Sequence, residues 1–128
     1  MKILYVITLP QLGGAQVHLL TLVTELLKRG HEAAVVVGGA GWLTEQLEER
    51  GVHCFVLPTL RREISPCRDF AALWHLRRVI KEYQPNLVHC HSSKAGLLGR
   101  IAARSLGVPA VFTVHGWAFT EGVAPMKR

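Results

Sequence analysis

Apolar residues follow two alternating patterns along the chain. Short continuous apolar runs are typical of strands buried on both faces, and they occur at residues 3–7, 33–37, 54–57, 87–90 and 110–114. Between these runs, apolar residues recur at helical spacing, which predicts helices over residues 15–29, 42–50, 69–84 and 94–106. We expect glycine to end three of these helices, at Gly30, Gly51 and Gly107.

The helical spacing also predicts which side chains face the core. Asp69 is expected to cap the third helix, and Ser92 or Ser93 the fourth. Residues 59–68 show no clear period and are interpreted as an exposed loop. The inner faces of the third and fourth helices are predicted to carry Phe70, Leu73, Trp74, Ile80 and Tyr83, and Leu97, Leu98, Ile101, Ala102 and Leu106, respectively.

Strands that are continuous rather than alternating in polarity indicate a parallel sheet covered on both faces. The sequence therefore predicts an α/β fold in which residues 1–128 form one doubly wound, Rossmann-like domain of about five strands. Right-handed crossovers favour the strand order 3-2-1-4-5. In this order the first and fourth strands are neighbours, and the loops that follow them flank the crevice where such sheets bind ligands.

Gly13 and Gly14 stand between the first strand and its helix, at that crevice. The free N–H groups of a helix N-terminus favour anions, and the missing Cβ atoms would let phosphates approach the backbone. The alternative is that these glycines only form the tight turn that any strand-helix unit needs, because their spacing is not the dinucleotide-binding fingerprint.

A second candidate segment follows the fourth strand. His91, Ser92, Ser93 and Lys94 place hydroxyl groups and a positive charge where a hydroxyl-rich or anionic ligand would lie, although simple helix capping explains the serines equally well. His115, followed by Gly116, comes just after the fifth strand at the same edge, where a histidine is either structural or functional.

Composition describes an ordinary globular protein, with 49% hydrophobic and 19% charged residues among 128. The three cysteines have no paired spacing, which favours reduced thiols and a cytoplasmic location. We find no signal peptide, and the apolar runs fall far short of the ~20 residues needed to span a bilayer.

The formal net charge of +6 favours an anionic partner, either a substrate or a lipid surface. Nucleic acid is the least favoured partner, because no series of aromatic residues is interleaved with the basic ones. The residues that would hold anionic headgroups are Arg61, Arg62, Arg77, Arg78 and Lys81, and the alternative is an ordinary solvated basic face.

Catalytic motifs are scarce. His89, Cys90 and His91 offer too few ligands for a zinc site, so we expect no metal, and a core thiol flanked by two structural imidazoles is the simpler interpretation. The sequence contains no nucleophilic triad order, glycine-lysine phosphate loop or paired carboxylates. We therefore expect that the domain cannot run an acid/base reaction alone. A flavodoxin-like cofactor binder is a further alternative.

Several stretches together resemble the N-terminal domain of a family-4 glycosyltransferase of the GT-B fold. The resemblance covers nearly the whole chain. Within the family, the sequence is similar to the branch that extends lipid-linked oligosaccharides in polysaccharide assembly. The stretches that carry it are Gly13-Gly14-Ala15, Arg29-Gly30-His31-Glu32, Pro85-Asn86-Leu87-Val88-His89-Cys90-His91-Ser92-Ser93-Lys94-Ala95-Gly96, Gly99-Arg100 and Thr113-Val114-His115-Gly116-Trp117-Ala118-Phe119.

The resemblance implies retaining transfer of a sugar from a nucleotide-sugar to a saccharide acceptor, with no metal or other cofactor. It implies that Gly13 and Gly14 contact phosphate or acceptor, and that His115 orients the transferring sugar. We expect that the second, donor-binding α/β domain of such enzymes is absent from this chain, which would then be inactive alone and would bind nucleotide weakly. It would be cytoplasmic, or peripheral on the inner membrane face. The alternative function is a non-catalytic binding or membrane-docking module.

Overall fold

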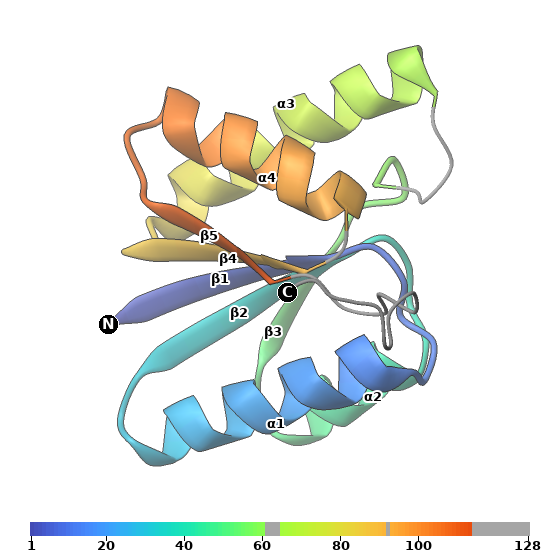
Figure 1. The fold of residues 1–128 in the computed structure, drawn as a ribbon. Helices are drawn as coiled ribbons and strands as arrows, with labels where there is room; N and C mark the ends of the chain where they lie inside the picture. The colour runs from blue at the N-terminus through green and yellow to red at the C-terminus, as the bar shows by residue number, and fades with distance from the viewer. Residues whose placement is uncertain (61–64, 92, 114–128) are drawn as a thin grey trace, which may run out of the picture.

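Strands and helices alternate from one end of the fold to the other (Figure 1). The computed structural model describes residues 1–60, 65–91 and 93–113, and within α4 the side chains of residues 93–95 are not described. The elements are β1 (Lys2–Ile7), α1 (Gly14–Lys28), β2 (Glu32–Val37), α2 (Trp42–Glu49), β3 (His53–Val56), α3 (Pro66–Tyr83), β4 (Leu87–His91), α4 (Ser93–Ser105) and β5 (Ala110–Thr113).

All strands are parallel, and their order is β3-β2-β1-β4-β5. Helices α1 and α2 cover one face of the sheet, and α3 and α4 cover the other (Figure 1). The predicted fold class and strand order are therefore confirmed. The order has the consequence that β1 and β4 end side by side, with Ile7 paired to His91.

Two hydrophobic cores lie on the two sides of the sheet. Alternate residues of β1 supply both, because successive side chains of a strand point to opposite faces. Leu4 and Val6 join the core beneath α3 and α4, whereas Tyr5 and Ile7 join the core beneath α1 and α2. This double burial explains why the strands read as continuous apolar runs.

The start of α3 differs from the prediction. The helix begins at Pro66, after Ser65, and proline suits the first helical position because its missing N–H would be unpaired there anyway. Asp69 lies within the first turn, where its carboxylate accepts a 3.3 Å hydrogen bond from the N–H of Ser65. The segment before α3 is also not wholly an exposed loop, because Leu60 is fully buried.

The predicted inner faces of α3 and α4 were wrong at four positions. Helix α3 buries Ala72, Leu76, Val79 and Ile80 instead of its aromatic stripe. The surfaces of α3 and α4 that meet the sheet are lined with small or aliphatic residues. Four large side chains that were predicted to face inward therefore lie in solvent. The four exposed residues and their exposed fractions are Phe70 (62%), Trp74 (53%), Leu97 (60%) and Ile101 (44%).

Glycine allows α4 to approach the sheet closely. A Cβ atom at Gly96 would overlap the ring of Phe112, and one at Gly99 would overlap the Sγ atom of Cys90. Burial raises the pKa of the Cys90 thiol to about 12, so this side chain packs as a small neutral group. The position of α4 is therefore set by its contacts with the flanking strands β4 and β5.

We expect Gly99→Ala to lower the free energy of unfolding by roughly 1–2 kcal/mol, because overpacking outweighs the better helix propensity of alanine. The loss should shrink in a Cys90→Ala background, where the overlapping sulfur is gone. Urea denaturation of the unmodified chain, the two single variants and the double variant measures the coupling energy between residues 90 and 99. An equal loss in both backgrounds would contradict the contact. Gly14→Ala is the control, since a Cβ there meets no atom within 4 Å.

Three helices end as predicted on a glycine of positive φ, namely Gly30 (+86°), Gly51 (+79°) and Gly107 (+73°). Helix α3 ends differently, on Gln84 with a φ of 54°. A residue with a Cβ pays a steric penalty in this left-handed conformation. The end of α3 at Gln84 is therefore strained.

Gln84→Gly should raise the free energy of unfolding by about 0.5–1 kcal/mol. The relief of strain in the folded chain outweighs the extra conformational freedom that glycine gives the unfolded chain. Gly30→Ala is the matched reverse change, with no atom within 4 Å of the added Cβ, and it should lower stability by about 1 kcal/mol. Both are read from urea denaturation midpoints. A destabilised Gln84→Gly protein would refute the strain.

Candidate functional site

The candidate site lies where the strands end at their carboxyl edge. Because β1 and β4 are neighbours, the loop from Ile7 to Gly13 and the junction from His91 into α4 flank the same point of the edge. This is the topological switch point of the sheet, the usual place for a ligand in an open α/β fold. The structure thus brings Gly13, Gly14 and His91 to one edge, as the strand order predicts.

Gly13 and Gly14 form the start of α1. Gly13 is the N-cap residue with extended backbone (φ −171°, ψ 177°), and no side chain caps the helix there. The first N–H groups of α1 are therefore not satisfied by a capping side chain, and the helix dipole makes this end partially positive. A Cβ at Gly14 would meet no atom within 4 Å, so the space above this residue is open.

Gln16 fixes the loop in front of α1, and sequence analysis missed this role. Its Nε2 atom donates a 2.8 Å hydrogen bond to the Leu9 carbonyl, and the side chain is only 8% exposed. Its Oε1 atom lies 2.8 Å from where a Cβ on Gly13 would stand, so a side chain at residue 13 would disturb this arrangement. A polar residue in the first turn of an otherwise apolar helix face was the available signal.

Gly38 joins three loops of the edge and was also missed. Its N–H donates a 2.9 Å hydrogen bond to the Thr8 carbonyl. A Cβ on Gly38 would overlap the carbonyl oxygens of Leu60 and Thr8. The loops after β1, β2 and β3 therefore meet backbone to backbone, which only glycine at residue 38 permits.

Histidine rings and a tyrosine ring pack together on the α1 side of β4. The ring centroids of His89 and His91 are 4.4 Å apart, and Tyr5 lies 5.3 Å from His89. His18 of α1 lies 6.2 Å from His91, and His89 shares a 2.6 Å hydrogen bond with Thr113. His91 is fully buried in this cluster, so its predicted contact with a substrate stays a prediction.

The remaining predicted site residues fall into two groups. Ser92, His115, Gly116, Arg61 and Arg62 lie outside the described residues. Ser93 and Lys94 open α4, so their backbone lies at the switch point, but their side chains are not described. The basic residues Arg77, Arg78 and Lys81 lie on α3, which covers a face of the sheet rather than its carboxyl edge (Figure 1).

The arrangement suits an anionic ligand better than acid/base chemistry. The loops that follow β1 and β2, and the described part of the loop that follows β3, contain no Asp or Glu. Two helix N-termini, those of α1 and α4, start at this edge and favour negative charge. Within the described residues, no group of three or more His, Cys, Asp or Glu side chains is placed to hold a metal ion. None of the described helices is long and apolar enough to cross a membrane.

Comparison with known proteins identifies the family of this chain. The sequence profile described as Glycosyltransferase Family 4 matches residues 12–128. An Escherichia coli protein named UDP-Gal:alpha-D-GlcNAc-diphosphoundecaprenol alpha-1,3-galactosyltransferase is 41% identical over 119 residues, which cover 92% of this chain and 30% of that protein. The E. coli O-antigen biosynthesis glycosyltransferase WbnH is 26% identical over 114 residues, covering 89% of this chain and 32% of that protein.

The fold is also shared with solved structures. The crystal structure of MurG from Acinetobacter baumannii superposes with a TM-score of 0.70 at 17% identity, over 89% of this chain and 35% of that one. The chain thus spans about a third of the length of these relatives. Since the family profile matches most of the sequence, the chain belongs to Glycosyltransferase Family 4.

Proposed function

We propose that this chain is the acceptor-side domain of a retaining glycosyltransferase that moves a sugar from a nucleotide-sugar to a lipid-linked saccharide in cell-surface polysaccharide synthesis. Membership of Glycosyltransferase Family 4 supports the transferase class. The name of the 41% identical E. coli relative supports the choice of UDP-galactose and a GlcNAc-diphospholipid as the first substrates to test. The single structural observation behind the proposal is the uncapped, open start of α1 at the switch point.

In this proposal the start of α1 holds a diphosphate group. The phosphate oxygens would accept hydrogen bonds from the first N–H groups of α1, and the open space above Gly14 leaves room for them. Gln16 and Gly38 act as positioning residues, because they fix the loop without needing to touch the ligand. The loops after β1 and β2 carry no carboxylate, which supports an anionic ligand at this point of the edge.

The reacting groups of the proposal come from the family resemblance. We assign the sugar-facing role to His115, with Gly116 beside it, and acceptor contacts to His91, Ser92, Ser93 and Lys94. No metal or other cofactor takes part. The donor nucleotide is bound mainly by a second α/β domain outside these 128 residues, in keeping with the share of its relatives that the chain spans.

Gly14→Asp tests the phosphate role without disturbing the fold. The added Cβ meets no atom within 4 Å, and a carboxylate favours the start of a helix, so the thermal midpoint should be unchanged or higher. It also repels a diphosphate, and affinity should fall about tenfold, or about 1.4 kcal/mol. Binding of a short-chain GlcNAc-diphosphate lipid analogue is followed by amide NMR shifts, which we expect at residues 13–17.

Gly14→Ala is the matched control, because it adds the same Cβ without the charge. Any loss of binding in the alanine variant is the steric effect of the Cβ, and the aspartate variant should bind more weakly than the alanine variant. Equal binding by the aspartate and alanine variants would contradict the phosphate role. Shifts confined to residues far from the start of α1 would also contradict it, even if the ligand binds.

The 128-residue chain should catalyse no transfer by itself. In this proposal the donor-binding side of the cleft lies outside residues 1–128, so these residues alone do not hold donor and acceptor in a reactive geometry. The measurement is release of UDP from UDP-galactose in the presence of the acceptor analogue, with calorimetry of UDP binding alongside. Turnover, or tight nucleotide binding, would contradict the assignment as an acceptor-side domain.

A further inference from the structure

The outer face of α3 carries an exposed aromatic pair next to positive charge. Phe70 and Trp74 lie one helical turn apart, and their ring centroids are 6.2 Å apart in an edge-to-face arrangement. The guanidinium carbon of Arg77 lies 4.9 Å from the centroid of the Trp74 ring. Lys81 continues the stripe by one more turn. Aromatic and basic side chains thus follow one another along the helix.

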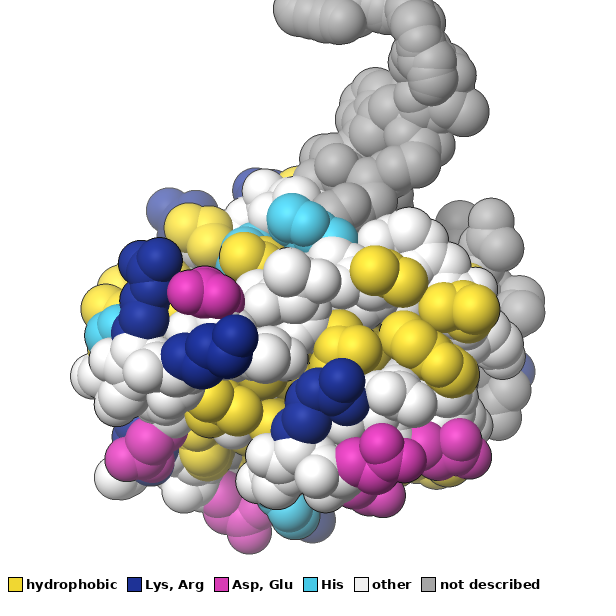
Figure 2. Space-filling model, turned by 90° about the horizontal axis from the view of Figure 1, so that it is seen from below, with side chains coloured by type: hydrophobic (Ala, Val, Ile, Leu, Met, Phe, Trp, Pro, Cys, Tyr) yellow, Lys and Arg dark blue, Asp and Glu magenta, His cyan; other side chains and the backbone are white. Residues whose placement is uncertain are grey.

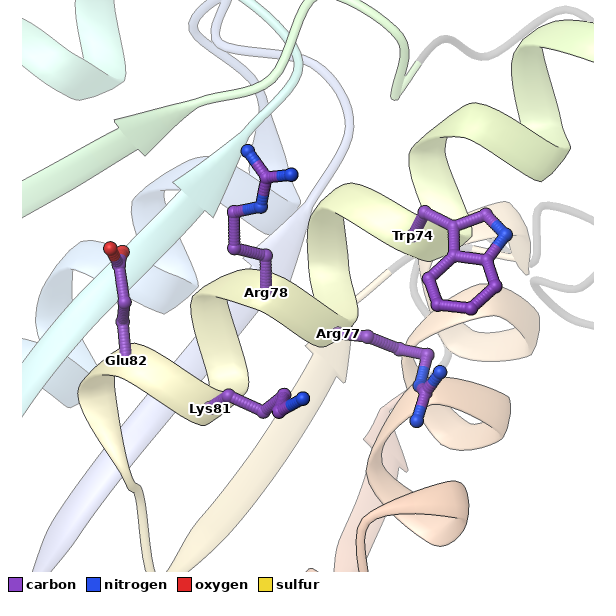
Figure 3. Close-up of a pocket in the computed structure, with 5 residues that line it drawn as sticks. All are labelled: Trp74, Arg77, Arg78, Lys81 and Glu82. Carbon is purple, nitrogen blue, oxygen red and sulfur yellow. The ribbon is translucent and has the colours of Figure 1, made fainter.

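Trp74, Arg77 and Lys81 border a hollow of about 510 Å³, which is also lined by Arg78 and Glu82. Figure 3 shows Trp74, Arg77 and Lys81 projecting to one side of α3, while Arg78 and Glu82 project to the other. Within the described part of the chain, Arg77, Arg78 and Lys81 form no ion pair with a carboxylate. The Nε atom of Arg77 is buried there without a hydrogen-bond partner.

The two helical layers differ in charge. Helices α1 and α2 with their C-cap residues carry three basic and four acidic residues, which lie interspersed on the face shown in Figure 2. Helices α3 and α4 carry seven basic and two acidic residues. The latter are Arg68, Asp69, Arg77, Arg78, Lys81, Glu82, Lys94, Arg100 and Arg104. Most of the positive net charge of the described chain therefore belongs to one layer.

Four exposed large apolar side chains belong to the same layer, whereas α1 and α2 expose one, Val17. Leu97 and Ile101 of α4 are exposed, as are Phe70 and Trp74 of α3, and the two helices pack against each other. An exposed apolar surface flanked by positive charge is the arrangement that matches a bilayer, whose anionic headgroups cover an apolar interior. Tryptophan is also enriched at the level of the headgroups.

We propose that the outer face of α3 docks onto a membrane surface rich in anionic phospholipid. Trp74 and Phe70 enter the headgroup region, and Arg77, Arg78 and Lys81 hold the phosphate groups in and beside the hollow. A nucleic acid fits less well, because two aromatic rings that meet edge to face do not form a platform for successive bases. The inference does not rest on the proposed transferase function, since it concerns a face of the sheet and not its carboxyl edge.

Vesicle sedimentation tests the docking. The 128-residue chain should sediment with vesicles of phosphatidylcholine and phosphatidylglycerol, and not with phosphatidylcholine alone. Binding should weaken as salt rises, because surface charge interactions are screened. Each basic residue near an anionic surface contributes about 1 kcal/mol, so R77Q/R78Q/K81Q should lower the partition coefficient by roughly a hundredfold.

The matched control is K28Q/R29Q/R50Q, which removes the same charge from the layer of α1 and α2 and should bind nearly as the unmodified chain does. F70S/W74S is an independent variant that keeps the charge and should lower partition at least tenfold. Circular dichroism establishes that each variant is folded. If R77Q/R78Q/K81Q does not fold, F70S/W74S tests the docking alone, and partition equal to that of the unmodified chain would contradict it.

Three results would overturn the proposal. Absence of binding to anionic vesicles would exclude a docking surface, and an equal loss in the test and control charge variants would show that only net charge matters. A dimer in sedimentation velocity that F70S/W74S dissociates, without vesicle binding, would assign the same face to a second copy of the chain.

Discussion

The parallel pairing of β1 with β2 on one side and β4 on the other satisfies the backbone of the central strand along both of its edges. With its edges paired, β1 can be buried only by covering both faces, and its alternating side chains feed two separate cores. The same pairing makes β1 and β4 end together although more than eighty residues separate them in sequence. The candidate site exists because of this reversal in strand order.

Much of the fold follows from local signals. The five strands, their order and the three glycine helix ends were predictable because each depends on a run of a few residues or on general rules of chain connection. The rotation of α3 and α4 about their own axes was not predictable from local signals. Helix α3 offers two apolar stripes, and the choice between them depends on its packing against α4 and the sheet. The rotation of α4 likewise depends on contacts such as that of Gly99 with Cys90 of β4.

The site was predictable in the same uneven way. Strand order alone brings Gly13, Gly14 and His91 to one edge, and the structure agrees. The burial of His91 in a cluster of rings depends on Tyr5 and His18, which periodicity does not connect to it. Gln16 and Gly38 act through hydrogen bonds and backbone contacts across loops, and such contacts leave little trace in a pattern of polar and apolar residues.

The meeting of three loops at Gly38 has a consequence for how this edge can diversify. Backbone atoms around residue 38 leave no room for even one added carbon, so change there would propagate into every loop of the edge. Gln11, Leu12 and Ala40, by contrast, are exposed on the same loops. Evolution or engineering can therefore vary these exposed positions, whereas Gly38, which holds the loops together, stays constant.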